Sequence, residues 1–270
     1  MAQITGDTAA EVNVKAIELV MRRGAIRETR NEATRELLDV SMRITRPLSA
    51  LNMGIDGRNL VMPIGYVEGL MLVGQCSIPE WLTERWAVFG TWVDDGVLTG
   101  SYGVRAHGAV RHVVSELKRA PMTRRAVLTI NNTHRDLASP SSDVPCTLSL
   151  QFLLRDGELH MIATMRSNDL WLGLPYDMIM FVMLQAAIAR ELRVRVGRYV
   201  HHAGSAHVYR KHWEACDGLK PAKRIELQGG DVWAAENVGD IGAWCRRTLM
   251  NPQAATAGSA FESMITEALR

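Results

Sequence analysis

The sequence predicts a mixed α/β (α+β) fold, in which a mixed sheet packs against helices around one buried central helix. Residues 176–192 are apolar on nearly every face of a helix, which is typical of a helix buried in the core. Strand-like runs flank Asp156-Gly157, a dipeptide favoured in tight hairpin turns. Apolar residues recur at helical spacing over 10–21. We find no internal repeat and expect one domain, residues 1–270.

The other elements follow from the same periodicities, taken in chain order. An arginine-rich turn should end the first helix at about residue 24. The patterns then predict a strand at 36–46, a buried helix at 61–73 that carries one acid, a helix at about 106–118, a strand at 126–130, a polar loop at 134–145, the hairpin strands at 147–154 and 158–166, a strand at 194–202, and a helix at 260–269 after a less patterned stretch from 217.

Composition excludes several classes of protein. The 270 residues are 47% hydrophobic and 22% charged, as in ordinary globular domains, and the net charge of +2 gives no global field for binding nucleic acid. The four cysteines are too far apart for a CxxC metal or redox motif, which favours reduced thiols and a cytoplasmic location. Neither a secretory signal nor a membrane span is expected. We therefore expect no metal, nucleic-acid or membrane partner.

Cys146 is a candidate nucleophile because it follows a proline and opens a strand. A lone cysteine is most often a small buried hydrophobe. However, Arg166 ends the return strand of the hairpin, so it can approach Cys146 and stabilise the nucleophilic thiolate.

Three further pairs suit a nucleotide. Arg124-Arg125 and Arg166-Ser167 offer the guanidinium and hydroxyl groups that a phosphate needs, although an arginine pair is more often solvated surface charge. His207 and Tyr209 should project to one side of an extended segment, where they can bind a sugar hydroxyl or serve as satisfied structural groups.

Taken together, several runs resemble the core of the thymidylate synthase family. The resemblance is strong from about 124 to 214, weaker from 30 to 103, and lost in the C-terminal tail. The order and spacing of six runs carry it: Asp143-Val-Pro-Cys146, Gln151-Phe152, Asp156-Gly157, Arg166-Ser-Asn-Asp169, Leu172-Gly-Leu-Pro-Tyr-Asp177 and His207-Val-Tyr209.

The resemblance implies a role for each matching residue. Cys146 would add to C6 of a pyrimidine nucleotide, so that C5 attacks the one-carbon unit of 5,10-methylenetetrahydrofolate. Glu68 would organise water and proton transfer. The implied phosphate ligands are Arg30, Arg166 and Ser167, with Arg124 and Arg125 contributed by the other subunit of a homodimer. His207 and Tyr209 would hold the 3′ hydroxyl, and Asp169, Gly173 and Trp92 would lie beside the folate.

Asp177 departs from the family, which has Asn at this position. An amide offers a donor and an acceptor, matching N3–H and O4 of uracil, whereas an ionised carboxylate only accepts. It therefore matches the 4-amino group of cytosine and a protonated N3, as in the similar deoxycytidylate hydroxymethylases. A tolerated surface change is the other reading, but Asp177 begins a buried helix.

A second departure concerns the product. The family's tryptophan-rich segment is altered at 87–92, and its C-terminal closing segment has no match at 265–270. Both changes could admit water to an exocyclic methylene, giving hydroxymethyl instead of methyl. We expect 5-hydroxymethylation of dCMP, favoured over CMP by Ser167 and the arginine pair. The alternatives are a CMP hydroxymethylase of nucleoside antibiotic synthesis, a dUMP or dCMP C5-methylating synthase, and a nucleotide-binding regulator without catalysis.

Overall fold

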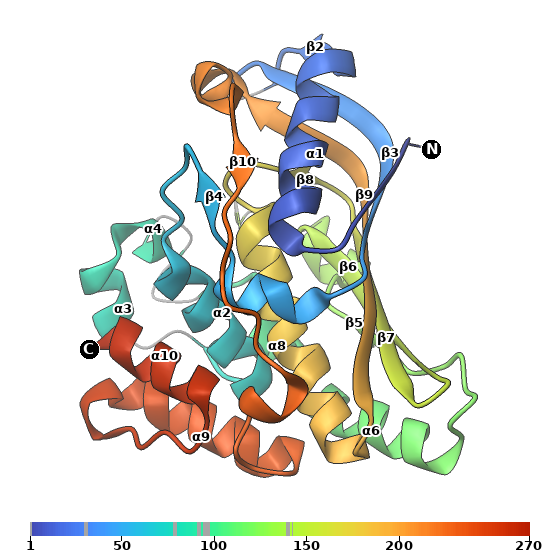
Figure 1. The fold of residues 1–270 in the computed structure, drawn as a ribbon, viewed down its shortest axis with the longest axis vertical. Helices are drawn as coiled ribbons and strands as arrows, with labels where there is room; N and C mark the ends of the chain where they lie inside the picture. Colours follow the sequence, from blue (N-terminus) through green and yellow to red (C-terminus); the bar gives the residue numbers. More distant parts are fainter. Residues whose placement is uncertain are drawn as a thin grey trace.

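The fold is a mixed sheet with helices layered against one face (Figure 1). This computed structural model describes residues 2–29, 32–77, 80–90, 93, 98–138, 141 and 143–270, with the backbone alone at 88 and 89. The α-helices are α1 (Ala9–Arg23), α2 (Met62–Gly74), α3 (Glu80–Arg85), α4 (Ala87–Gly90), α5 (Tyr102–Arg105), α6 (Ala109–Arg119), α7 (Thr133–Asp136), α8 (Leu174–Leu192), α9 (Val238–Met250) and α10 (Ala260–Leu269).

The strands form one large sheet and one small one. They are β1 (Ala2–Gly6), β2 (Ala25–Arg27), β3 (Thr34–Ile44), β4 (Ile55–Asp56), β5 (Val127–Thr129), β6 (Thr147–Arg155), β7 (Glu158–Met165), β8 (Asn168–Asp169), β9 (Arg195–Tyr209) and β10 (Lys220–Pro221). The large sheet has the order β1-β3-β9-β7-β6-β5, with β2 on β3 and β8 on β9. Strand β9 runs parallel to β7 and β8 and antiparallel to β3, so the sheet is mixed as predicted.

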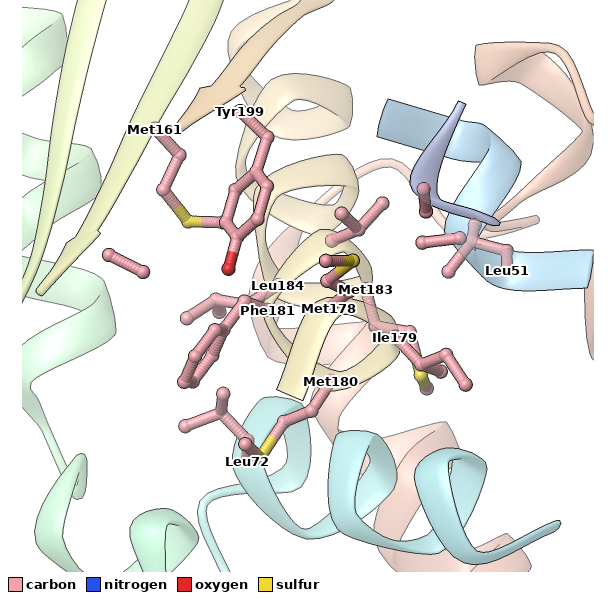
Figure 2. Packing of buried hydrophobic residues seen from close by; sticks show 14 of the residues in the cluster. Leu51, Leu72, Met161, Met178, Ile179, Met180, Phe181, Met183, Leu184 and Tyr199 are labelled. Carbon is pink, nitrogen blue, oxygen red and sulfur yellow. The ribbon is translucent and has the colours of Figure 1, made fainter. Parts of the chain in front are cut away.

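The central helix is α8, which the sequence predicted at 176–192. Helices α1 and α8 cover the sheet, α2 packs on α8, and α9 and α10 pack on α2 (Figure 1). Figure 2 shows side chains leaving α8 in several directions, with Phe181 toward Tyr199 on β9 and Met180 toward Leu72 on α2. Phe181, Tyr199 and Leu72 are fully buried. A helix buried on all sides needs an apolar side chain at nearly every position, which explains the pattern.

Most predicted elements are present with shifted ends. The N-terminal helix, the helix that carries Glu68, the hairpin and the C-terminal helix are confirmed. At the hairpin turn Asp156 and Gly157 both have positive φ, +51° and +73°, the conformation that Asp-Gly favours.

Four predictions of local structure need correction. The helix expected at 106–118 begins only at Ala109, because Gly108 has a φ of +76° and separates α6 from the short α5. The polar loop at 134–145 holds part of α7, whose Asp136 pairs with the buried Arg105 at 2.7 Å. The strand expected to end at 202 continues to Tyr209, because β3 pairs with it over that length. The stretch from 217 contains α9, which packs on α2.

Among the described residues, no helix has the length and apolarity needed to cross a membrane. In the same part of the chain, His, Cys, Asp and Glu side chains nowhere gather in threes as metal ligands would.

Candidate functional site

Cys146 ends the loop that leads into β6, as predicted, and Arg166 fixes this loop to the end of β7. The Arg166 backbone N–H donates to the Cys146 carbonyl at 2.9 Å. Its guanidinium Nε donates to the carbonyl of Pro145 at 3.0 Å, and one terminal nitrogen donates to that of Val144 at 2.8 Å. The thiol is therefore held beside a guanidinium that is still exposed.

A cavity of about 270 Å³ opens beside Cys146. Helix α2 contributes Glu68 and Met71 to its wall, and α8 contributes Asp177 and Met180. The remaining lining residues come from two loops: Leu98, Gly100, Ser101, Tyr102 and Gly103 from one, and Asp143, Val144 and Pro145 from the other. All three residues predicted to be catalytic thus share one cavity.

The charges around Cys146 oppose one another. Burial raises the pKa of the Cys146 thiol, whereas the positive charge of Arg166 lowers it. The carboxyls of Asp177, Asp143 and Asp169 raise it further. The net shift is upward, so burial outweighs the thiolate stabilisation that the sequence analysis expected from Arg166. The thiol is therefore protonated at neutral pH in the free protein, and its proton must leave when a ligand arrives.

Two carboxyls in the cavity titrate near neutrality. Burial raises the pKa of Glu68 to about 8, with a further contribution from the charge of Asp177. Burial likewise raises the pKa of Asp177 to about 7, although a hydrogen bond from Asn168 favours its ionised form. Groups with pKa values in this range can donate or accept a proton at physiological pH.

Tyr102 is a site residue that the sequence analysis did not identify. It lines the cavity, accepts a hydrogen bond at 3.0 Å from the hydroxyl of Thr147, and stacks on Phe181 with 6.2 Å between ring centroids. The only sequence signal was the glycine-rich run around it. Gly103 has no room for a side chain, since a Cβ there would lie 2.2 Å from the Met71 carbonyl oxygen. This close packing holds Tyr102 against the end of α2.

The predicted sugar ligands and two of the predicted phosphate ligands lie around the pairing of β8 with the C-terminal part of β9. Strand β8 pairs with β9 in parallel, which places Asp169 opposite His207. The rings of His207 and Tyr209 lie edge to face, with centroids 5.2 Å apart, so they project to one side as predicted. Ser167 connects Arg166 to β8 and is partly exposed. These residues lie beside the cavity rather than among its lining residues.

Asp169 and Gly173 shape the turn into α8. One carboxyl oxygen of Asp169 accepts the backbone N–H groups of Trp171 and Leu172, at 2.8 and 3.1 Å. A Cβ on Gly173 would lie 3.1 Å from the Asp169 carbonyl oxygen and 3.4 Å from Asp177 Oδ2. A glycine therefore lets the first turn of α8 approach β8 closely.

Two of the predicted phosphate ligands are remote from the lining of the cavity in their own chain. Arg124 and Arg125 are exposed just before the edge strand β5 and do not line it. Arg30 and Trp92 lie outside the residues that the structure describes.

Comparison with known families decides the relationship. The family model for thymidylate synthase matches residues 73–226, more than half of the chain. This range includes Cys146, Asp177 and the paired strands β8 and β9. The chain belongs to the thymidylate synthase family. The fold described above is thus a thymidylate synthase family fold, as the sequence resemblance implied.

Individual family members match over shorter ranges. A thymidylate synthase from Staphylococcus haemolyticus is 35% identical over 108 residues, covering 39% of this chain and 33% of that protein. One from Bacillus subtilis subsp. natto is 30% identical over 133 residues, covering 49% and 46%. A deoxyuridylate hydroxymethyltransferase from Bacillus phage SP01 is 27% identical over 227 residues, covering 77% and 59%. The chain therefore spans between 33% and 59% of the length of these thymidylate synthase family relatives.

Proposed function

We propose that this protein hydroxymethylates C5 of a cytidine monophosphate, with dCMP as the first candidate substrate and CMP as the second. The observation that carries the proposal is the buried carboxyl of Asp177 in the same cavity as Cys146. A carboxylate accepts hydrogen bonds from the 4-amino group and the protonated N3 of cytosine, whereas O4 of uracil would face it without a donor.

Cys146 acts as the nucleophile, and its Sγ forms a bond to C6 of the base. Electron density moves into the ring, so N3 takes a proton and C5 becomes nucleophilic. Glu68 is protonated at neutral pH, because its pKa is about 8, and it supplies and orders protons at the opposite wall of the cavity. Asp177 holds the ring through its acceptors. For hydroxymethylation to balance, C5 must lose its proton, the bond between the new carbon and the folate nitrogen must break so that tetrahydrofolate leaves, and the oxygen of a water molecule must bond to that carbon. The ring electrons then expel Sγ from C6, N3 gives up its proton, and the thiol is restored.

The phosphate and sugar bind outside the cavity. The exposed guanidinium of Arg166 and the hydroxyl of Ser167 take phosphate oxygens, and His207 and Tyr209 bind the 3′ hydroxyl. We assign the phosphate role also to Arg30, and to Arg124 and Arg125 of a second subunit, as the family resemblance implies; Arg124 and Arg125 are both exposed on their own chain. The active form would then be a homodimer built from single-domain chains of residues 1–270.

The residues in and beside the cavity fit a folate. A pterin ring carries N–H donors, and Asp169 keeps one carboxyl oxygen without a hydrogen bond to the described part of the protein, while Met71 and Met180 give the cavity an apolar wall. These residues fit a flat ring with donors at its edge. When bound, 5,10-methylenetetrahydrofolate supplies the one-carbon unit. Asp169 and Gly173 would hold it, and we assign Trp92 to the same role.

A specific observation keeps uracil as the second candidate base. The matching phage relative is named a deoxyuridylate hydroxymethyltransferase, which supports hydroxymethyl as the product but names a uracil substrate. A protonated Asp177 carboxyl also offers one donor and one acceptor, as an amide does.

The test is a mass-resolved product assay with dCMP, CMP and dUMP in parallel. We expect a 5-hydroxymethyl nucleotide from dCMP without dihydrofolate. Asp177→Asn should shift the ratio of kcat/KM from cytosine toward uracil by at least about 100-fold, as expected when two hydrogen-bonded contacts change partners. A methyl product with dihydrofolate would establish the synthase reaction instead, and a variant that kept the wild-type base ratio would refute the reading by Asp177. Binding without turnover of any of the three would favour a regulator.

A further inference from the structure

Asn168 lies directly behind Asp177. It is 2% exposed on β8, and its amide Nδ2 donates to Asp177 Oδ2 at 2.7 Å. The other amide atom, Oδ1, is buried without a hydrogen-bond partner among the described residues. A buried carbonyl without a partner is costly, so such an atom needs an explanation.

The backbone fixes this pair from both sides. Asn168 is paired with Ala206 of β9, which holds β8 in place. Gly173 closes the gap to α8, since a Cβ there would lie 3.3 Å from Asn168 Nδ2 and 3.4 Å from Asp177 Oδ2. Asp177 lines the cavity while Asn168 does not. Oδ2 already accepts one hydrogen bond from Asn168 and keeps a second lone pair, whereas Oδ1 has no such bond and is the oxygen whose lone pairs are both left for a ligand.

We propose that Asn168 is a positioning residue that makes Asp177 present a hydrogen-bond acceptor to the base, and that it thereby sets the preference of the site for cytosine over uracil. This inference rests on the proposed function and names a residue that acts through Asp177.

Asn168 can form a hydrogen bond with Asp177 in either protonation state of the acid. When Asp177 is ionised, Nδ2 of Asn168 donates to Oδ2 and Oδ1 accepts from the base. When Asp177 is protonated, a half-turn of the amide brings its unpartnered oxygen to Oδ2, which then donates to it. Oδ1 remains an acceptor in both states. It matches the 4-amino group of cytosine and repels O4 of uracil.

Without Asn168, the proton can reside on either oxygen. A protonated Oδ1 donates to O4, so the acid acts as an amide would and admits uracil. The ionisable groups around Asp177 are Glu68 on α2, Asp169 on β8, Tyr199 on β9, Tyr102 on α5 and the Cys146 thiol. Glu68 and Asp169 are acids, which disfavour a second negative charge. The hydroxyls of Tyr199 and Tyr102 pair with His201 and Thr147, so among the described residues the side-chain hydrogen bond to the Asp177 carboxyl comes from Asn168.

The experiment measures the dissociation constants of dCMP and dUMP by calorimetry at pH 6 and pH 8. Asn168→Ala should reduce the preference for dCMP at pH 6 by about tenfold or more and by less at pH 8, because the protonated acid dominates at the lower pH. Asn168→Leu fills the same space without polar atoms and repeats the test if the alanine variant is unstable. Asn168→Ser keeps a hydroxyl that can donate or accept, and should restore most of the preference.

A double-mutant cycle separates this role from a structural one. In the Asp177→Asn background, Asn168→Ala should leave the dCMP to dUMP ratio unchanged. The proposal would be overturned if the wild type, Asn168→Ala and Asn168→Leu had the same ratio of dCMP to dUMP affinity at both pH values. It would also be overturned if Asn168→Ala changed that ratio as much in the Asp177→Asn background as in the wild type. A wild type that prefers dUMP would refute the proposed substrate. The role of Asn168 would then still be decided by the double-mutant cycle, that is, by whether its substitution changes the ratio of dCMP to dUMP affinity only when Asp177 is present.

Discussion

Replacing Asp177 with Asn should stabilise the fold, and increasingly so as pH rises. Burial raises the pKa of this carboxyl from 3.8 to about 7. The folded chain then binds more protons than the unfolded chain between these values, so the carboxyl lowers the free energy of unfolding as pH rises through that window. Well below pH 3.8 the carboxyl is protonated in both states and does not change the free energy of unfolding. Well above pH 7 it is ionised in both states and lowers that free energy by the full amount.

The size of the effect follows from the same pKa values. At about 1.36 kcal/mol per pKa unit, the cost of the carboxyl grows by about 2–3 kcal/mol between pH 5 and pH 8. For a chain of this length that corresponds to a gain of about 5–10 °C in the melting temperature of Asp177→Asn over wild type at pH 8 relative to pH 5. The amide can still accept the hydrogen bond from Asn168, so the packing is kept.

Thermal and urea unfolding at pH 5, 6, 7 and 8 would measure the stability difference between Asp177→Asn and wild type. The matched control is Asp156→Asn, the same chemical change at an exposed turn position with a φ of +51°, which Asn tolerates. We expect the control to track wild type at every pH. A stability difference between Asp177→Asn and wild type that stays constant from pH 5 to pH 8 would show that the Asp177 carboxyl is solvated normally, and the electrostatic account of the cavity would be wrong.

Three further predictions concern catalysis. Cys146→Ser should lower turnover by more than about 1000-fold while the nucleotide still binds, and release of tritium from C5 at the wild-type rate would contradict the assignment. The kcat should fall as pH rises through about 8, because Glu68 loses its proton there. Glu68→Gln should lower kcat by about 100-fold and abolish that fall. If the variant kept the same alkaline decrease in kcat, Glu68 would have no role in proton transfer. Arg125→Ala and Cys146→Ser should each be nearly inactive but recover about a quarter of wild-type activity when their subunits are exchanged, since half of the dimers then carry one intact site. Inactive heterodimers, confirmed by native mass spectrometry, would mean that Arg125 serves its own subunit.

The sequence predicted the elements whose signal is local and failed where contacts between distant segments decide. The helix of residues 176–192 was evident because every face is apolar, and the hairpin because Asp-Gly fixes its turn. The length of β9 was underestimated because pairing with β3, rather than its own composition, carries it to Tyr209. Helix α9 was missed although Asn237 caps its N-terminus by accepting from the Asp240 N–H at 2.9 Å.

The site shows the same division. The family resemblance implied that Cys146, Glu68 and Asp177 belong to one site, and all three line the same cavity. The upward shift of the Cys146 pKa could not be read from the neighbouring Arg166, because it depends on burial created by α2 and α8. Tyr102 carried no motif of its own, and it joins the site only because Gly103 packs against the end of α2.

The acids around the cavity favour a ligand that arrives with donors. Glu68, Asp143 and Asp177 all line it, while the guanidinium of Arg166 is turned toward the loop carbonyls and the exterior. Negative charge pushed into a ring at this place would be destabilised unless the ring takes a proton at the same time. In the reaction that we propose, a cytosine ring would do so at N3 when Cys146 adds to C6, and its new N3–H and its amino group would both find acceptors. The phosphate would remain outside, on the exposed side of Arg166, so the proposed binding mode separates the anionic part of the nucleotide from the acidic cavity around its base.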